Sequence, residues 1–230
     1  MVTENYRKVE ARVAAACERC GRKREEVTLI AVSKTKPVEM IQELIAAGVR
    51  DFGENKAQEM KEKIEQITDP LRWHFIGHLQ TNKVKYVVGR ACLIHSVSSL
   101  HLAEAIQKEA DKKNVQCPVL VEVNIANEVT KSGIGEADAV ELVRQVAALP
   151  NLKVRGLMAI APPVEDPEEN RPYFREMRRL AESIREMGLP GVSMEELSMG
   201  MTGDFEVAIE EGATMVRVGT AIFGERLKAD

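Results

Sequence analysis

Long apolar stretches are absent from this chain of 230 residues. A helix that crosses a bilayer needs about 20 apolar residues in succession, and no window of the sequence comes near that length. The N-terminal segment 1–26 carries charges throughout and lacks the apolar centre of a signal peptide. We therefore expect a cytoplasmic protein that has no contact with a membrane.

Cysteine pairs and clusters of positive charge are also scarce. Among the four cysteines, only Cys17 and Cys20 form a CxxC pair, and no second pair or nearby pair of histidines completes a zinc site. The formal net charge is −4, and the basic residues are spread along the chain. Such a distribution argues against nucleic acid as a partner. The 44% of apolar residues is enough for a full globular core.

Apolar runs and amphipathic segments alternate along the sequence after a first helix predicted over 4–20. Each run rich in β-branched residues is followed by a helical pattern or, at the end, by a short tail. The predicted helices cover 37–47, 55–67, 82–88, 99–113, 136–149, 167–187 and 204–211. The predicted strands cover 27–34, 49–53, 73–76, 92–97, 118–124, 154–160, 196–199 and 215–218.

This strict alternation indicates parallel strands joined by crossover helices. Eight such units in this length predict an α/β fold of the (β/α)8 or TIM-barrel type. We expect a single domain over 1–230, in which 1–24 form a helical extension packed on the barrel. The alternative is an open doubly wound sheet, which usually has fewer strands and a glycine-rich first turn. The first strand ends instead in AVSKTKP, which contains no glycine.

The lysines of AVSKTKP are candidates for chemistry, because active-site groups of a barrel come from the carboxyl ends of its strands. Ile30, Val32 and Lys34 alternate and therefore share one face of the strand. Barrel closure brings Arg217, near the end of the last strand, close to Lys34. An amine desolvated beside another cation has a lowered pKa and attacks carbonyl groups. Lys36 stands further out, before a proline, and is predicted to be a surface residue.

Two turns near the C-terminus, SMGMTGD and RVGTAIFG, offer hydroxyl groups, glycines and backbone N–H donors. Barrels often bind a phosphate group in the loops after strands seven and eight. Either turn alone would be an ordinary tight turn, but the pair favours a phosphate site. Arg217 would face a pyridine nitrogen or, alternatively, form a salt bridge with Glu206. A reactive lysine, a phosphate site and an inward arginine together indicate pyridoxal phosphate.

Several motifs, in order and nearly from end to end, resemble those of the pyridoxal phosphate homeostasis protein family: AVSKTKP, FGEN, HFIGHLQTNK, VNIANEVTKSG, GLM and SMGMTGDFEVAIEEGATMVRVGTAIFG. That family is similar in fold to the barrel domain of alanine racemase, of fold type III. The sequence departs from the family's pattern at Thr202, where serine is common, but it keeps a hydroxyl group. The resemblance implies a Schiff base between the cofactor and Lys34, with these further cofactor contacts: phosphate at Ser198, Gly219 and Thr220, the ring nitrogen at Arg217, and the ring pocket at Asn55 and Met199.

Three functions fit a lysine-anchored cofactor. The first is a monomer that holds pyridoxal phosphate, delivers it to apo-enzymes and takes part in vitamin B6 homeostasis without robust turnover. The second is a racemase or decarboxylase of amino acids, which normally has a further β-domain and a second acid–base residue. The tyrosines Tyr6, Tyr86 and Tyr173 lie in helical patterns and do not supply that residue. The third is an aldolase-like barrel, whose lysine normally lies later in the chain.

A few other polar residues remain without a fixed role. His74 is interpreted as structural, and His78 as a residue at the rim of the pocket. Lys131 is either a solvated loop lysine, which we favour, or a second amine near the cofactor. The charged helix that contains AQEMKEKIEQI is predicted to present a solvated face.

Overall fold

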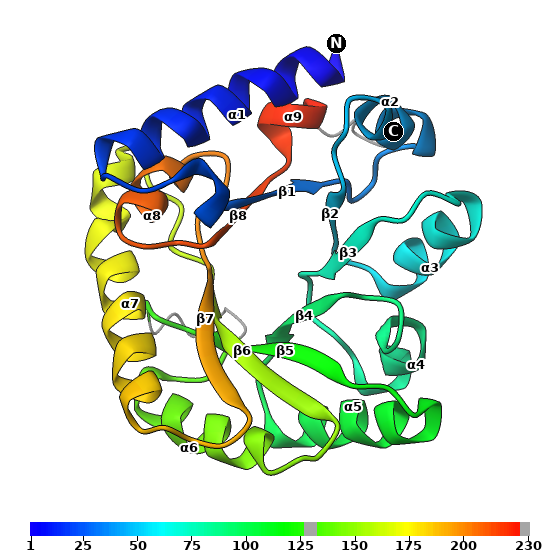
Figure 1. Ribbon diagram of the computed structural model, residues 1–230, viewed down its shortest axis with the longest axis vertical. Helices are drawn as coiled ribbons and strands as arrows, with labels where there is room; N and C mark the ends of the chain where they lie inside the picture. Colours follow the sequence, from blue (N-terminus) through cyan, green and yellow to red (C-terminus); the bar gives the residue numbers. More distant parts are fainter. Residues whose placement is uncertain (127–132, 226–230) are drawn as a thin grey trace.

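Eight parallel strands close into a barrel in the computed structural model, which describes residues 1–126 and 133–225 (Figure 1). Each strand pairs with the next, and β8 pairs with β1, so the predicted (β/α)8 fold is confirmed and the open sheet is excluded. The strands are β1 (Thr28–Val32), β2 (Asp51–Glu54), β3 (Arg72–Phe75), β4 (Leu93–Val97), β5 (Cys117–Val123), β6 (Leu152–Ala159), β7 (Val192–Ser198) and β8 (Met215–Val218).

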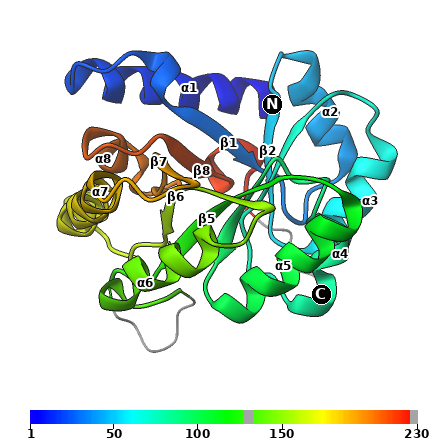
Figure 2. The ribbon, with the colours of Figure 1, turned by 60° about the horizontal axis from the view of Figure 1, so that its bottom comes forward.

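Helices surround the barrel, as Figures 1 and 2 show. In the described ranges no helix is both long and apolar enough to cross a membrane. The α-helices are α1 (Val2–Arg19), α2 (Val38–Ala46), α3 (Ala57–Gln66), α4 (Val84–Val87), α5 (Leu100–Lys113), α6 (Glu136–Ala147), α7 (Arg171–Glu186), α8 (Phe205–Glu210) and α9 (Thr220–Phe223). Three short 3-10 helices are η1 (Arg24–Glu26), η2 (Thr81–Lys83) and η3 (Pro167–Asn170).

Two elements differ from the sequence-based expectation. β7 begins at Val192, four residues before the predicted start. The prediction placed the start too late because the exposed Glu195 interrupts the apolar residues of the strand. The residues after β8, predicted as a tail, form the single turn α9. A helix of four residues is too short to show a helical repeat in the sequence.

Helix α1 packs on α2, α8 and α9 and so covers the place where the barrel closes (Figures 1 and 2). Its buried residues Val9, Val13 and Ala16 recur at helical spacing, which leaves the opposite face in water. Beyond the helix, the guanidinium of Arg22 donates to the carbonyl oxygens of Ile209 and Ala213, both at 2.8 Å. These contacts fix the N-terminal segment on the outside of β8 and α8.

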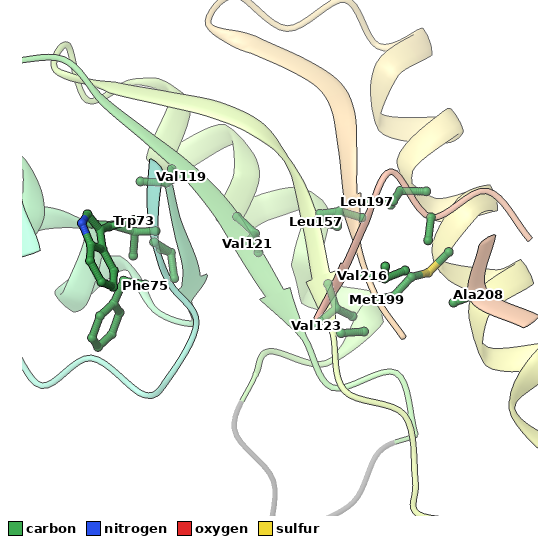
Figure 3. Packing of buried hydrophobic residues seen from close by; sticks show 14 of the residues in the cluster. Trp73, Phe75, Val119, Val121, Val123, Leu157, Leu197, Met199, Ala208 and Val216 are labelled. Atoms are coloured by element: carbon green, nitrogen blue, oxygen red, sulfur yellow. The ribbon is translucent and has the colours of Figure 1, made fainter. Parts of the chain in front are cut away.

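The strands are buried on both faces, as expected for a parallel barrel. Figure 3 shows part of the outer cluster, in which Val119, Val121 and Val123 of β5 lie on one side of the strand. Residues of the opposite parity point inside the barrel, where a smaller apolar cluster is formed by Ile30, Leu93, Leu120, Met158 and Met215. Above this inner cluster, the carboxyl ends of the strands surround the candidate site.

Candidate functional site

A cavity of about 350 Å³ lies at the carboxyl ends of the strands. Five of the seven predicted site residues line it: Lys34, Asn55, Arg217, Gly219 and Thr220. Residues that follow β1, β2, β6, β7 and β8 therefore meet in one place, as the barrel rule predicts. The other lining residues are Val32, Lys36, Ile76, Ile160, Met201, Thr202, Gly203 and Gly224.

Lys34 lies two residues beyond the end of β1, in a short loop rather than in the strand. The next residue, Thr35, has a φ of 62°, a conformation that turns the chain away directly after the lysine. The register of β1 against β8 pairs Ile30 with Arg217, which places both chain segments beside the cavity. Lys34 is half-buried, and it lies on the same inward side of the chain as Ile30 although the strand has ended.

A buried lysine on α3 holds the loop that carries Lys34. Lys63 Nζ donates to the Ser33 carbonyl at 2.7 Å, to Glu54 Oε1 at 2.7 Å and to Glu59 Oε1 at 2.8 Å. Glu54 Oε1 accepts a second hydrogen bond from Ser33 Oγ at 2.6 Å, and Glu59 Oε1 accepts one from the Thr35 N–H at 2.6 Å. We call Lys63, Glu54 and Glu59 the α3 ion cluster.

The α3 ion cluster corrects the expectation that the charged helix presents only a solvated face. Lys63 is 5% exposed and Glu54 is fully buried, whereas Lys61 on the same helix is half-buried. Burial raises the pKa of Glu54, and the Lys63 ammonium opposes that rise. The cluster therefore combines a desolvated carboxyl group with a cation that compensates it.

Lys36 is half-buried and also lines the cavity, so it lies only in part at the surface. Its Nζ donates to three carbonyl oxygens at the end of α9: Phe223 at 3.2 Å, Gly224 at 3.0 Å and Glu225 at 2.8 Å. A cation at this place satisfies carbonyl groups that the helix leaves without an N–H partner. Lys36 is therefore engaged in holding α9 against the first loop.

Arg217 is 4% exposed and reaches the cavity from inside the barrel. Its Nη1 donates to Ser198 Oγ at 2.6 Å and its Nη2 to the Ala159 carbonyl at 2.9 Å. Burial lowers the pKa of Arg217 to about 10, so it remains a cation at neutral pH. The alternative salt bridge with Glu206 is wrong, because Glu206 lies outside the barrel and accepts from Arg12 at 2.7 Å.

Ser198 and Met199 are fully buried and are not lining residues of the cavity. The Ser198 hydroxyl lies between Arg217 and His95 Nδ1, the latter at 2.8 Å, which is a different contact from the implied phosphate contact. The side chain of Met199 packs in the outer cluster and lies next to Ala208 of α8 (Figure 3). Neighbouring residues of an extended chain point to opposite sides. Ser198 therefore points into the barrel and Met199 points away from it.

The histidines divide into buried and exposed ones. His74 is buried and contacts His95 Nε2 at 3.0 Å and Asp51 Oδ1 at 3.1 Å, in agreement with its structural interpretation. His78 is exposed and is not among the residues that line the cavity. His95 was not singled out from the sequence, although it shares the inward parity of Leu93. Lys131 lies outside the described residues.

Asn55 presents an unused hydrogen-bonding atom at the cavity. Its Oδ1 is buried and has no hydrogen-bond partner within the described part of the chain. Gly77 permits the close approach of the Asn55 backbone, because a Cβ at position 77 would lie 2.2 Å from the Asn55 carbonyl oxygen. An orphaned amide oxygen beside a cavity fits a ligand that carries a donor.

Both predicted glycine turns lie at the cavity. Gly203 and Thr202 line it after β7, and Gly219 and Thr220 line it after β8. Gly200, within the first turn, has a φ of 93°, and a Cβ there would lie 2.6 Å from the Cβ of Ala208. The chain can make this tight turn only with glycine, which sets the hydroxyl of Thr202 beside the cavity.

The charges around the cavity are of one sign. Lys34, Lys36 and Arg217 line it, and none of the described lining residues is acidic. Such a surface attracts an anion, and the two threonine hydroxyl groups add donors for it. An amine, an anion-binding surface and a buried guanidinium in a cavity of this size suit a small phosphorylated aldehyde.

Comparisons with known proteins agree with this geometry. Residues 5–227 match the family model of the alanine racemase N-terminal domain. The chain is 49% identical over 225 residues to a pyridoxal phosphate homeostasis protein of Aquifex aeolicus, with 97% of both chains covered. It is 42% identical over 229 residues to the protein of the same name in Escherichia coli K12, with 98% of this chain and 97% of the other covered.

Solved structures give the same result. PipY of Synechococcus elongatus PCC7942, solved with PLP bound, has a TM-score of 0.85 and 33% identity, and the match covers 97% of this chain and 100% of PipY. Alanine racemase of Clostridium difficile has a TM-score of 0.76 but 15% identity, over 99% of this chain and 58% of the racemase, and thus shares the fold alone. The chain belongs to the family of the pyridoxal phosphate homeostasis proteins, which has the fold of the alanine racemase N-terminal domain.

Proposed function

We propose that this protein binds pyridoxal 5'-phosphate at Lys34 and takes part in vitamin B6 homeostasis. The observation that carries the proposal is a single cavity in which Lys34 meets Arg217 and the turn at Gly219 and Thr220. PipY, a relative at 33% identity, has been solved with PLP bound, which supports the same ligand here. The absence of acidic side chains among the described lining residues suits the phosphate group.

The polar residues at and behind the cavity have different parts in this proposal. The Lys34 amine bonds covalently to the aldehyde of the cofactor, while Thr202 and Thr220 donate to the phosphate. Asn55 Oδ1, which has no other hydrogen-bond partner in the described part of the chain, accepts a hydrogen bond from the bound molecule. Ser198 acts indirectly, by holding Arg217 at 2.6 Å.

Arg217 limits the chemistry of the site. When bound, pyridoxal phosphate supplies an aldehyde and a pyridine ring that withdraws electrons from the amine carbon. A guanidinium beside the ring nitrogen disfavours its protonation, so the ring withdraws electrons less strongly. We therefore propose a holding function in place of robust turnover.

The surroundings of Lys34 support the same conclusion. A racemase needs a second acid–base group across the substrate from its lysine. No histidine, cysteine, tyrosine or carboxylate is among the described lining residues, and the ammonium of Lys36 is bonded to three carbonyl oxygens of 223–225. We propose that the protein acts as a cytoplasmic monomer and passes its cofactor to apo-enzymes.

Reduction with borohydride tests the covalent attachment. The protein is loaded with pyridoxal 5'-phosphate, reduced and digested, and the modified peptide is identified by mass spectrometry. The adduct is expected on Lys34, lost in Lys34→Ala and retained in Lys36→Ala. An adduct that survives in Lys34→Ala and disappears in Lys36→Ala would refute the assignment.

Turnover is tested separately with the pure, loaded protein. Each of the common amino acids is incubated with it, and racemisation and decarboxylation are followed by chiral chromatography and gas release. Rates at or near those of the reaction with free pyridoxal phosphate are expected. A rate near the typical enzymatic value of about 10 s⁻¹ would overturn the holding function.

A further inference from the structure

A row of hydrogen bonds crosses the interior of the barrel from the cavity to the opposite end. Arg217 Nη1 contacts Ser198 Oγ at 2.6 Å, and Ser198 Oγ contacts His95 Nδ1 at 2.8 Å. His95 Nε2 lies 3.0 Å from His74 Nδ1, and His74 Nε2 lies 3.1 Å from Asp51 Oδ1. We call these five residues the interior chain, which links β8, β7, β4, β3 and β2.

The two ends of the interior chain determine the direction of every hydrogen bond in it. The guanidinium of Arg217 can only donate, so it occupies a lone pair of the Ser198 oxygen and leaves the Ser198 hydroxyl to donate to His95 Nδ1. His95 must then carry its proton on Nε2 and donate to His74 Nδ1. His74 in turn carries its proton on Nε2 and donates to the carboxylate of Asp51, which can only accept.

With both histidines neutral, each ring uses one nitrogen as a donor and the other as an acceptor, and the Ser198 hydroxyl has a partner for its proton. Burial lowers the pKa of His95 well below its ordinary value, and the positive charge of Arg217 acts in the same direction. A proton added to the chain would make His95 donate to Ser198, whose oxygen already accepts from Arg217. The Ser198 proton would then lack a partner in the chain, and a buried unpaired donor is costly.

The far end of the interior chain lies at a second cavity, of about 270 Å³, on the amino-terminal side of the barrel. Asp51, His74 and Arg72 line it, and Asp51 Oδ1 accepts from Arg72 Nε at 2.7 Å. None of these three residues lines the cavity that contains Lys34. Arg155 also lines the second cavity, but its guanidinium pairs with Glu195, outside the interior chain.

We propose that His95 is a positioning residue for Arg217, and that Asp51 and His74 fix the tautomer of His95 from the opposite end of the barrel. His95 Nδ1 accepts a hydrogen bond from the Ser198 hydroxyl. This hydrogen bond orients the Ser198 oxygen so that its lone pairs face Arg217. The orientation of the guanidinium in the cofactor cavity then depends on an anion that does not touch the cofactor. This inference deepens the proposed function and rests on it for its effect on the cofactor.

Nuclear magnetic resonance of the cofactor-free protein tests the tautomers directly. In protein with ¹⁵N-labelled histidine, both buried rings are expected to be neutral at pH 7 and protonated on Nε2. His95→Asn and His74→Gln assign the signals. A His95 ring protonated on Nδ1, or on both nitrogens, at pH 7 would overturn the interior chain. Because no cofactor is present, this result is independent of whether the protein binds pyridoxal phosphate.

Substitutions test the positioning of Arg217. In His95→Asn the amide oxygen replaces Nδ1 as the acceptor for Ser198, whereas His95→Leu removes the acceptor. The Kd for pyridoxal 5'-phosphate, measured by absorbance titration, is expected to rise about tenfold in His95→Leu, as for the loss of one hydrogen bond, and less in His95→Asn. Equal affinities and visible spectra for wild type and His95→Leu, both folded by circular dichroism, would refute the positioning role.

Substitution at the far end separates the interior chain from a general effect of the second cavity. Asp51→Asn removes the anion that fixes His74, and it is expected to shift the visible spectrum of the loaded protein. Arg155→Gln changes a charge in the same cavity without touching the interior chain and is expected to leave the spectrum unchanged. Equal shifts in the two variants, or no shift in Asp51→Asn, would contradict the coupling. Loss of all binding in wild type would instead refute the proposed function.

Discussion

The two cations proposed to contact the cofactor are held by two different kinds of polar network. The loop of Lys34 is fixed by the α3 ion cluster, in which Lys63 contacts two carboxylates and a backbone carbonyl at 2.7 to 2.8 Å. Arg217 is fixed by the interior chain of hydroxyl and imidazole groups, with contacts of 2.6 to 3.1 Å. The first network is ionic and local, whereas the second is mostly neutral and crosses the barrel.

The difference follows from how the backbone of each cation is supported. Arg217 lies within β8, whose ladder with β1 already fixes the backbone, so only the side chain needs orientation. Lys34 lies beyond the last residue of β1, and its neighbour Thr35 has a positive φ. The Ser33 N–H still donates to the Gly53 carbonyl at 3.0 Å, but the Ser33 carbonyl and the Thr35 N–H need further partners, and the α3 ion cluster provides them.

Removal of the central cation of the α3 ion cluster should have the largest effect. Lys63→Met leaves the buried Glu54 without its compensating charge, and we expect the free energy of unfolding to fall by about 3–5 kcal/mol. Urea denaturation at pH 7 measures the change. Lys61→Met is the matched control on the same helix, since its half-buried ion pair with Glu65 contributes about 0–1 kcal/mol.

The double variant Lys63→Met with Glu54→Leu sharpens this result. Because a leucine side chain at position 54 does not present a buried charge, the double variant is expected to be more stable than Lys63→Met alone by about 1–3 kcal/mol. Its adduct with pyridoxal phosphate should still form slowly, because the Ser33 carbonyl loses its donor Lys63 and the Ser33 hydroxyl loses its acceptor Glu54. If the double variant were less stable than both single variants, the cluster would not act as an ion pair.

The fold and part of the site follow from the sequence because they depend on periodicity. The alternation of strands with helices predicts the closed barrel, and the parity of Ile30 with Lys34 places the lysine inward. The same rule would have separated Ser198 from Met199, since neighbouring residues of a strand point to opposite sides. It does not say whether an inward serine contacts a ligand or another side chain.

The α3 ion cluster was missed although the sequence contains a signal for it. Ala57, Met60, Lys63 and Ile67 recur at helical spacing and are all buried, so Lys63 lies on the apolar face of the helix. A lysine at such a position requires a buried partner. Which carboxylate serves depends on the packing of α3 against β2, and this long-range contact cannot be read from local spacing.

Acid should weaken the far end of the interior chain through the loss of the Asp51 charge. Burial alone would raise the pKa of Asp51, but hydrogen bonds from His74 and Arg72 outweigh it and lower the pKa below its ordinary value. The stabilisation by Asp51 is therefore full above the unfolded pKa of about 4 and is lost as pH falls through the lower folded pKa. The raised pKa of Glu54 has the opposite sign and does not add to the loss at low pH.

Asp51→Asn tests this contribution of the Asp51 carboxylate. The variant should be less stable than wild type by about 1–3 kcal/mol at pH 7, because His74 and Arg72 lose an ionised partner. The difference should shrink as the pH is lowered below about 4, because the Asp51 carboxyl group is protonated first in the unfolded chain and then, at lower pH, in the folded protein. Thermal unfolding from pH 7 to pH 3 measures it, and a difference that stays constant over this range would exclude Asp51 as the titrating group.

Lys36 should show the smallest effect, because its support is neither ionic nor buried. Its ammonium donates to the carbonyl oxygens of Phe223, Gly224 and Glu225, and water can replace it at the two exposed ones. Lys36→Met is expected to lower the free energy of unfolding by about 0.5–1.5 kcal/mol and to increase hydrogen exchange at α9 alone. If the free energy of unfolding fell as much as in Lys63→Met, both lysines would stabilise the first loop in the same way. The contrast between ionic contacts and contacts with neutral groups would then not explain how this site is held.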